Sequence, residues 1–586
     1  DGGELLTIRI PYEALQPGPI GKKLAVIDYD GALKRWYPAI DLEDPRLLAG
    51  EGEWADEANP KFHQQMAYAV VMQTILRFEF ALGREIQWPR RGFNRLDPFY
   101  GKLRIFPHAL QEANAFFDPE LNALLFGYFP SQDATSTLNL PDQTVFTCLS
   151  YDIVAHEATH ALLHSTNPHF IEPTGYDAPA FHEAFADIVA LFQHFSFEDS
   201  LIDAVQRTGG LIYRNQFAPD VRPEKNGPQV QAEIGQENPL VQLARQFGEA
   251  MGKRAALRSA LGTAPGSLDL DAISEPHDRG AILVAAVFDA FFSVYVERTR
   301  DLIKIAYPDG RLPKANFLNA DLAKRLAGEA ARTAERMLTI CIRALDYCAP
   351  VDIEFGDYLR ALVTADYEVS PEDGRGYRRA LIQAFRSRGI RPKGVLSYSE
   401  ESLRWSKFDA QKHSGLVNNM QDRFLRIWQK LTELENAEIE GNEPAIQRAK
   451  SELFEKLWGK AEAMRAAFGL TTKNFKAESY ALVQRLNPNG SVRRILRARC
   501  VEQRDATFDA GPGARTEKFE FKGGCTLLVE RDGTVSYVIG KSLGDKDREQ
   551  RQRQYLEQKA ASYAFGAYKR FSVAEDCGLK AVHRGY

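Results

Sequence analysis

The stretch YDIVAHEATHALLH, residues 151–164, combines an apolar helical pattern with two histidines four positions apart. In an α-helix such positions project from one face about 6 Å apart along the axis, so His156 and His160 can reach one metal ion. Glu157 lies beside them, where a carboxylate can take a proton from metal-bound water. The alternative is a chance pattern, which composition alone would produce about one or two times in a hundred. We therefore expect a buried helix that supports metal-assisted hydrolysis.

A zinc site needs a third protein ligand and an open position. His164 cannot supply that ligand, because it lies eight residues after the first histidine, about 12 Å along the helix axis. The stretch AFHEAFADIVALF, residues 180–192, offers Glu183 and Asp187 on one face of an apolar helix. We predict that Glu183 binds the metal and that Asp187 accepts the outer ring N–H of a ligating histidine. The alternative is a structural salt-bridge or capping pair, and His182, about 100° round this helix from Glu183, is expected to point away from the metal.

Four separated segments of the chain resemble the gluzincins, and specifically the thermolysin-like neutral metallopeptidases. Residues 152–161 (DIVAHEATHA) resemble the zinc helix of that family, and residues 183–187 (EAFAD) resemble its third-ligand helix. Residues 114–117 (NAFF) resemble the edge strand that pairs with substrate backbone, and residues 276–283 (PHDRGAIL) resemble the segment that holds the transition-state histidine. The resemblance spans residues 60–390.

This resemblance implies a role for each residue around the metal. Asp187 would orient a ligand, Glu157 would be the general base and then the general acid, and His277 would hydrogen-bond the oxyanion of the tetrahedral intermediate. The ligands of one catalytic Zn²⁺ would be His156, His160 and Glu183.

The resemblance also implies contacts with a peptide or protein substrate. Asn114 and Ala115 would hold the peptide, Tyr176 would be a second oxyanion donor, and Arg258 would grip a substrate carbonyl. At Tyr176 and Arg258 the local spacing departs from the family pattern, so a core tyrosine and a surface arginine remain open as alternatives.

Other departures concern the surroundings of the site. Asp152 matches a position that contributes to calcium binding in the family, but His194 stands where another acidic ligand is expected, so a calcium site is doubtful. The Asn and Ser usual after the transition-state histidine are absent around Asp278 and Arg279.

The six cysteines contain no Cys-x-x-Cys pair, which fits neither a disulfide framework nor a cysteine zinc site. They favour a reducing, cytoplasmic location. A secreted mature form stays open, because the chain starts at Asp1 without a methionine.

The composition of the 586 residues, 44% hydrophobic and 26% charged, is that of a soluble globular chain with several domains. The longest apolar run, residues 281–296, is interrupted by Asp289 and is shorter than a membrane span, so it predicts a buried helix and no membrane partner. We predict an α+β fold in which a thermolysin-like catalytic region precedes a separate C-terminal part. The expected units are a β-rich N-terminal lobe with the zinc helix (1–185), an all-helical lobe (186–393), a helical segment (394–470) and a C-terminal domain with a β-hairpin (471–586).

Residues 394–586 carry 33 basic and 26 acidic residues, a net charge of +7, and the preceding 393 residues carry −12. This asymmetry favours docking of the tail on the acidic part. The arginines at positions 493–499 could alternatively contact nucleic acid, but no aromatic residues accompany them, so a solvated strand face is the preferred interpretation and no nucleic acid is expected. The Asp532-Gly533 pair between two strand-like runs predicts a β-hairpin.

The motifs predict a zinc-dependent metalloendopeptidase, a hydrolase that uses zinc-activated water with Glu157 as general base. An exopeptidase is not favoured, because the chain has no Gly-x-Met-Glu-Asn-like element to fix a free amine. The alternative from another class is a catalytically idle zinc-binding scaffold whose basic C-terminal domain binds a partner. The sequence predicts neither the oligomeric state nor the cleavage specificity.

Overall fold

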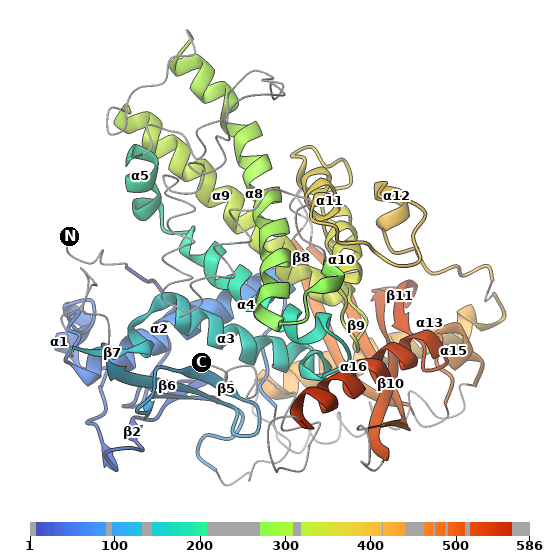
Figure 1. The fold of residues 1–586 in the computed structure, drawn as a ribbon, viewed down its shortest axis with the longest axis horizontal. Coiled ribbons are helices and arrows are strands. Elements are labelled where there is room, and N and C mark those ends of the chain that lie inside the picture. The colour runs from blue at the N-terminus through green and yellow to red at the C-terminus, as the bar shows by residue number, and fades with distance from the viewer. Residues whose placement is uncertain are drawn as a thin grey trace.

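The structure is a computed structural model that describes residues 7–89, 97–131, 143–207, 270–308, 318–412, 414–439, 462–472, 475–486, 490, 492–509 and 516–564. These residues form helices and sheets that are largely segregated along the chain (Figure 1). The predicted α+β class is therefore confirmed.

The N-terminal part contains a five-stranded mixed sheet with the order β1-β4-β6-β5 and with β7 paired to β6. β1 and β6 run parallel to β4, whereas β5 and β7 run antiparallel to β6. β5 thus lies at one end of the sheet, the edge position that the sequence resemblance implied. The strands are β1 (Leu24–Val26), β4 (Leu103–Leu110), β5 (Ala115–Asp118), β6 (Ala123–Pro130) and β7 (Thr144–Phe146), with a separate β2 (Tyr29–Asp30) and β3 (Arg35–Trp36) pair.

The long helix α2 (Pro60–Leu82) follows the short α1 (Pro45–Ala49) and packs against this sheet. The Asn59 side chain caps its first turn by accepting the Lys61 N–H, and proline at the first position suits a helix start. Gly83 ends it with a φ of 67°, where a side chain would collide with the backbone of Gln484 in the C-terminal sheet. The end of α2 is thus a contact with a distant part of the chain.

Two buried helices follow the first sheet. The 3-10 turn η1 (Thr147–Leu149) leads into α3 (Tyr151–Thr166), and η2 (Pro168–Ile171) separates α3 from α4 (Asp177–His194). Nearly every side chain of α3 and α4 is buried, because the two helices pack on each other and between α2 and α8. The chemistry-bearing side chains are therefore held in the interior.

The next part is helical throughout the residues that the structure describes. α8 contains the longest apolar run and is long and apolar enough to cross a membrane by length and composition, but it is mostly buried in the fold, as predicted. The elements are α5 (Glu198–Arg207), η4 (Leu270–Ala272), α8 (Pro276–Ala306), α9 (Ala320–Ala344), η5 (Leu345–Tyr347), α10 (Phe355–Tyr367), α11 (Tyr377–Ser387) and α12 (Glu400–Leu403).

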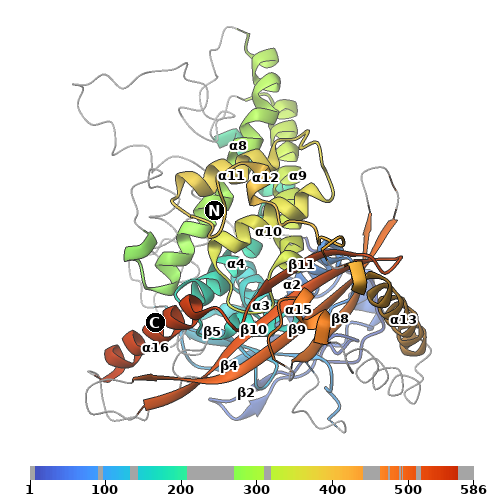
Figure 2. The same ribbon diagram turned by 90° about the vertical axis from the view of Figure 1, so that its right-hand side faces the viewer.

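The C-terminal part is a four-stranded antiparallel sheet with the order β11-β10-β9-β8. In Figure 2 its long strands cross the molecule diagonally, with α13 near one end and α16 near the other. The predicted hairpin is confirmed, because β10 and β11 pair antiparallel across the Asp532-Gly533 turn, where Gly533 has a φ of 84°. The elements are α13 (Ser414–Ile439), α15 (Glu462–Ala467), β8 (Lys476–Leu486), β9 (Val492–Asp509), β10 (Thr516–Glu530), β11 (Val535–Lys541) and α16 (Lys546–Ala564).

The C-terminal sheet docks on the helical part through buried ion pairs. Asp346, fully buried after α9, receives a bidentate contact from Arg84 at 2.8 and 2.9 Å. Arg485 of β8 adds a contact at 3.0 Å, and Arg497 of β9 lies 3.5 Å away. Although burial alone would raise it, these guanidinium groups hold the pKa of Asp346 below its usual range. Removing one partner of such a cluster leaves buried charge uncompensated.

The expectation that the β9 arginines form a solvated face is wrong for two of them. Arg497 and Arg499 are 4% and 1% exposed. Arg499 donates to the carbonyl oxygen of Thr166 at the end of α3 and to that of Leu345 at 3.0 Å. The carbonyl end of a helix attracts cations, so these arginines serve internal docking of the kind that the charge asymmetry favoured.

His169 adds a charged contact between the helical part and the C-terminal sheet. His169 in η2 lies 2.6 Å from Glu172 and 2.6 Å from Glu478 of β8, and Lys522 of β10 lies 2.5 Å from Glu172. Burial opposes the charged form, but hydrogen bonds to the two carboxylates raise the pKa of His169 to about 9. His169 is thus a cation at neutral pH.

Candidate metal centre

Helices α3 and α4 bring together the three predicted metal ligands. One donor atom from each of His156, His160 and Glu183 lies within 4.8 Å of the others, and all three residues are buried. The two Nε2 atoms are 2.9 Å apart. Glu183 places its carboxylate oxygens 3.6 Å from Nε2 of His156 and 3.7 Å from Nε2 of His160. Two imidazole nitrogens and a carboxylate therefore face one point.

A carboxylate orients the imidazole of His156 from behind. Oδ1 of Asp187 lies 2.9 Å from Nδ1 of His156, which is the contact predicted for it. Because Asp187 accepts the Nδ1 proton, the Nε2 lone pair of His156 is directed at the point where the three donor atoms converge.

His182 has a neighbour that the sequence analysis did not foresee. The structure puts its Nδ1 2.8 Å from Nδ1 of His160, with the two rings stacked at 5.0 Å between centroids. It was expected to point away from the metal, and it does lie behind a ligand, but as a direct neighbour of that ligand's outer nitrogen. The sequence held no signal for this contact, because it depends on how α4 packs on α3.

Two further predicted residues are buried on elements that carry or contact the three donor residues. Glu157, 1% exposed, follows the first ligand on α3. His277, 7% exposed, lies at the start of α8 with its Nδ1 3.2 Å from Oε2 of Glu183. Gly280 allows this approach, because a Cβ there would lie 2.8 Å from the carbonyl oxygen of Ala180 on α4.

β5, the strand predicted to hold substrate, packs beside α3, the helix that carries His156 and His160. Ala115 begins β5, which packs on α3, and the ring of Phe117 lies 5.7 Å from that of His164. His164 is thus a packed histidine, and burial lowers its pKa to about 4. The Asn114 carbonyl accepts the Gly127 N–H at 2.9 Å, and the Asn114 side chain accepts the Ala115 N–H at 2.9 Å. The backbone at the start of β5 is thereby held in place.

The other two predicted substrate contacts have different outcomes. Tyr176 precedes α4, but its hydroxyl donates to Gln558 of α16 and its ring packs edge-on against Tyr555 at 4.9 Å. The structure thus places Tyr176 at a contact with the C-terminal helix α16. Arg258 lies outside the described residues.

Asp152, which matches a calcium-binding position of the family, is in direct contact with His194, which stands where another acidic ligand is expected. Nδ1 of His194 lies 3.0 Å from Oδ1 of Asp152. A histidine therefore occupies part of the coordination space of this carboxylate, whereas Ca²⁺ prefers six to eight oxygen ligands.

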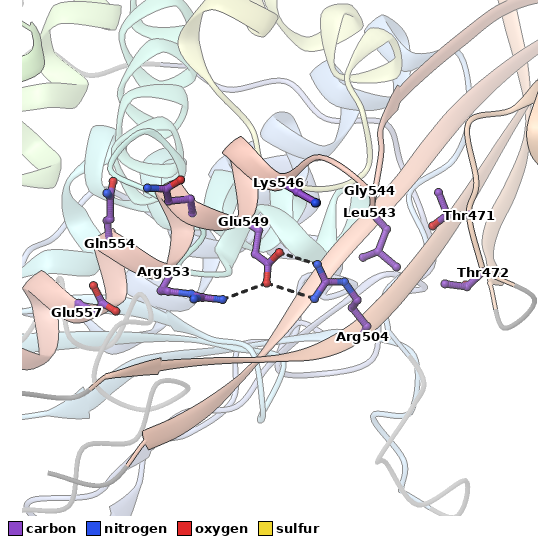
Figure 3. A pocket seen from close by; sticks show the side chains of 11 residues that line it. Thr471, Thr472, Arg504, Leu543, Gly544, Lys546, Glu549, Arg553, Gln554 and Glu557 are labelled. Atoms are coloured by element: carbon purple, nitrogen blue, oxygen red, sulfur yellow. Dashed lines mark hydrogen bonds and ion pairs between the residues drawn. The ribbon is translucent and has the colours of Figure 1, made fainter.

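A surface cavity of about 640 Å³ lies between α16 and β9 (Figure 3). Glu549 projects into it and forms ion pairs with Arg504 at 2.7 Å and with Arg553 at 3.3 Å. None of the predicted metal or catalytic residues lines it. The cavity is therefore a feature of the C-terminal part and not of the metal centre.

Comparisons with protein-family models, with curated proteins and with solved structures find no match for this chain. What the protein does is therefore inferred from the chemistry of the residues described above.

Proposed function

We propose that this protein is a zinc-dependent endopeptidase of the thermolysin-like kind. One observation carries the proposal: the donor atoms of His156, His160 and Glu183 converge within 4.8 Å, although the carboxylate comes from a different helix. Chance spacing of two histidines would not require a third ligand at that point.

The donor set fits Zn²⁺. Two imidazole nitrogens and one carboxylate are a known catalytic ligand set for this ion, with a fourth position left for water or substrate. Contact of the outer ring nitrogen of His156 with a carboxylate is the arrangement that raises the basicity of zinc-ligating histidines. When bound, Zn²⁺ supplies Lewis acidity and lowers the pKa of water towards about 7.

The protein groups would divide the remaining work. Glu157 takes the proton of the attacking water and returns it to the leaving amine, a role typically worth about 10²- to 10⁴-fold in rate. His277 donates a hydrogen bond to the oxyanion that develops on the scissile carbonyl. Burial of both groups supports these roles, since hydrogen bonds act more strongly where water is excluded.

An extended peptide is the substrate class that suits the neighbouring strand. β5 ends its sheet and packs on α3, so a peptide that pairs with its outer edge would lie along the metal helix. Strand pairing uses main-chain groups and does not require a free terminus, which favours an endopeptidase.

The test is cleavage of a denatured protein and of a quenched peptide library by the intact chain. We expect metal-dependent cleavage within peptides, and we expect Glu157→Gln to retain the metal while losing about 10²- to 10⁴-fold in kcat/KM. Glu120→Gln on the exposed β5–β6 turn is the matched control and should retain full activity. A chain that binds metal stoichiometrically but cleaves neither substrate would refute the proposal and favour the idle scaffold.

A further inference from the structure

A second group of metal-ligating side chains lies in the N-terminal part, apart from the centre described above. His63 on α2, His108 on β4 and Cys148 in η1 each place one donor atom within 4.8 Å of the others. Their exposed fractions are 1%, 1% and 0%. None of the three belongs to the motifs that predicted the catalytic site.

The hydrogen bonds around the two rings determine which nitrogens carry protons. Nε2 of His63 lies 2.9 Å from the Glu57 carbonyl oxygen, which can only accept, so this nitrogen carries a proton. Nδ1 of His108 lies 2.7 Å from Oδ1 of Asp28, and an ionised carboxylate also only accepts. If both rings are neutral, the inner nitrogens, Nδ1 of His63 and Nε2 of His108, then carry no proton and each presents a lone pair.

Those two inner nitrogens nevertheless face each other. Nδ1 of His63 and Nε2 of His108 are 2.8 Å apart. Two lone pairs at that distance repel unless a cation lies between or beside them. The cation can be a proton, which would make His108 an imidazolium, or a metal ion that both nitrogens and Cys148 bind.

We propose that His63, His108 and Cys148 form a second metal site, which binds Zn²⁺ through Nδ1, Nε2 and Sγ respectively. The sulfur favours a metal over the proton, because a thiolate and imidazole nitrogens are ligands that Zn²⁺ binds readily. Three protein ligands leave one position of a tetrahedron for a small ligand such as water. This site is independent of the proposed peptidase activity.

The surroundings of the site are built to hold one geometry. Oδ2 of Asp28 accepts a hydrogen bond from Nε2 of Gln64 at 2.6 Å. Oε1 of Gln64 accepts the Ile40 N–H at 2.8 Å, so the orientation of this amide is determined. Asp28 is therefore fixed as the acceptor for His108, as carboxylates behind zinc-ligating histidines are.

Aromatic rings enclose the remaining sides. The ring of Phe146 lies 4.6 Å from that of His63 and 5.4 Å from that of His108, and the Tyr37 ring lies 4.7 Å from that of His108. These rings restrict the access of water and of large ligands. The ion has only three protein ligands, but a substrate cannot reach it through these rings, so we infer a structural role for it and not a second catalytic one.

Metal binding here would join three elements that are distant in sequence. It would cross-link α2, β4 and the turn η1, and Cys148 lies eight residues before the first ligand of the catalytic centre. On binding, the Cys148 thiol releases its proton to solvent and a sulfur–metal bond forms, with no change in oxidation state. The expectation that no cysteine binds zinc considered only Cys-x-x-Cys pairs, whereas here a single cysteine joins two histidines.

The two sites can be distinguished because only this one contains sulfur. The full chain is stripped of metal with a chelator and reloaded with Co²⁺, and the bound cobalt and the near-ultraviolet thiolate-to-cobalt charge-transfer absorption are measured. We expect two Co²⁺ per chain and a thiolate band. In His160→Ala we expect one Co²⁺ with the band intact, and in Cys148→Ser one Co²⁺ without the band.

Cys341→Ser is the matched control, because Cys341 is a fully buried cysteine on α9. It should retain both ions and the band. A wild-type chain without a thiolate band, or a band that persists in Cys148→Ser, would overturn the proposal and leave a shared proton between the two rings. If Cys148→Ser does not fold, His108→Ala replaces it: we expect one Co²⁺ and a lost or shifted band, and an unchanged band with two Co²⁺ would overturn the proposal.

Discussion

Two clusters of possible metal ligands in the described residues each contain a pair of histidines with ring nitrogens face to face, and the two pairs differ in their origin and their neighbours. His156 and His160 come from one turn of α3, with Nε2 atoms 2.9 Å apart. His63 and His108 come from α2 and β4, with facing nitrogens 2.8 Å apart. Each pair has a carboxylate behind one ring and a third donor within 4.8 Å. Similar ligand geometry can thus arise from local helix spacing or from tertiary packing alone.

The neighbours of each pair indicate different uses. The α3 pair shares its helix with Glu157, and its carboxylate partner contacts His277; to these two residues we assign proton transfer and oxyanion stabilisation. The second pair is enclosed by rings such as Phe146. We infer that chemistry depends on what surrounds the ligands more than on the ligands themselves.

Removing one histidine from each pair should distinguish the catalytic role of the first pair from the structural role of the second. His160→Ala should lower kcat/KM by about 10³-fold or more, because the catalytic ion loses a ligand. His108→Ala should retain most of the activity at low temperature. The measurement is peptide cleavage together with metal content. Equal loss of activity in both variants at equal folded fraction would contradict the division.

A change at His277 tests the role of the proposed oxyanion donor beside the α3 pair. Among the described residues we find no matching donor beside the second pair. His277→Phe should lower kcat by about 10²- to 10³-fold, the usual effect of removing one oxyanion donor. KM and the bound metal should change little. A loss of metal in place of kcat would show that His277 supports Glu183, which it contacts at 3.2 Å, and not the transition state.

The two carboxylates behind the rings form a matched pair of variants. Asp187→Asn and Asp28→Asn should each weaken metal binding by about 10- to 100-fold, because the outer ring nitrogen loses its charged acceptor. Each change should affect only its own site, as measured by competition with a chelator. Loss of both ions in either variant would mean that the sites are coupled.

His169 provides a contrast, because both its nitrogens face carboxylates and its pKa is raised to about 9. Its unfolded value is about 6.5, so its stabilising contribution is fully present below that pH and is lost as pH rises through about 9. We expect the free energy of unfolding to fall by about 2 to 3 kcal/mol more in wild type than in His169→Gln over this range. Denaturant unfolding at several pH values measures it, and equal slopes would contradict the assignment.

Contacts between residues close along the chain were predicted from the sequence, whereas contacts between distant elements were harder to predict. Residues four apart on a helix share a face whatever surrounds them, so the α3 pair and the helix itself followed from the pattern. The convergence of Glu183 was predicted from chemical need and a resemblance, and the structure supplies the packing of α4 on α3 that brings it there. His182 and Tyr176 were harder, because their neighbours depend on how α4 packs and on where α16 lies.

By itself, the sequence determined the helices, the hairpin turn and the spacing of the α3 ligands, because backbone geometry and capping act between residues close along the chain. The tertiary structure alone decided that Arg497 and Arg499 are buried and that His63, His108 and Cys148 meet. These outcomes depend on how whole elements dock, since burial of apolar surface, which drives docking, is non-directional and leaves no short-range pattern.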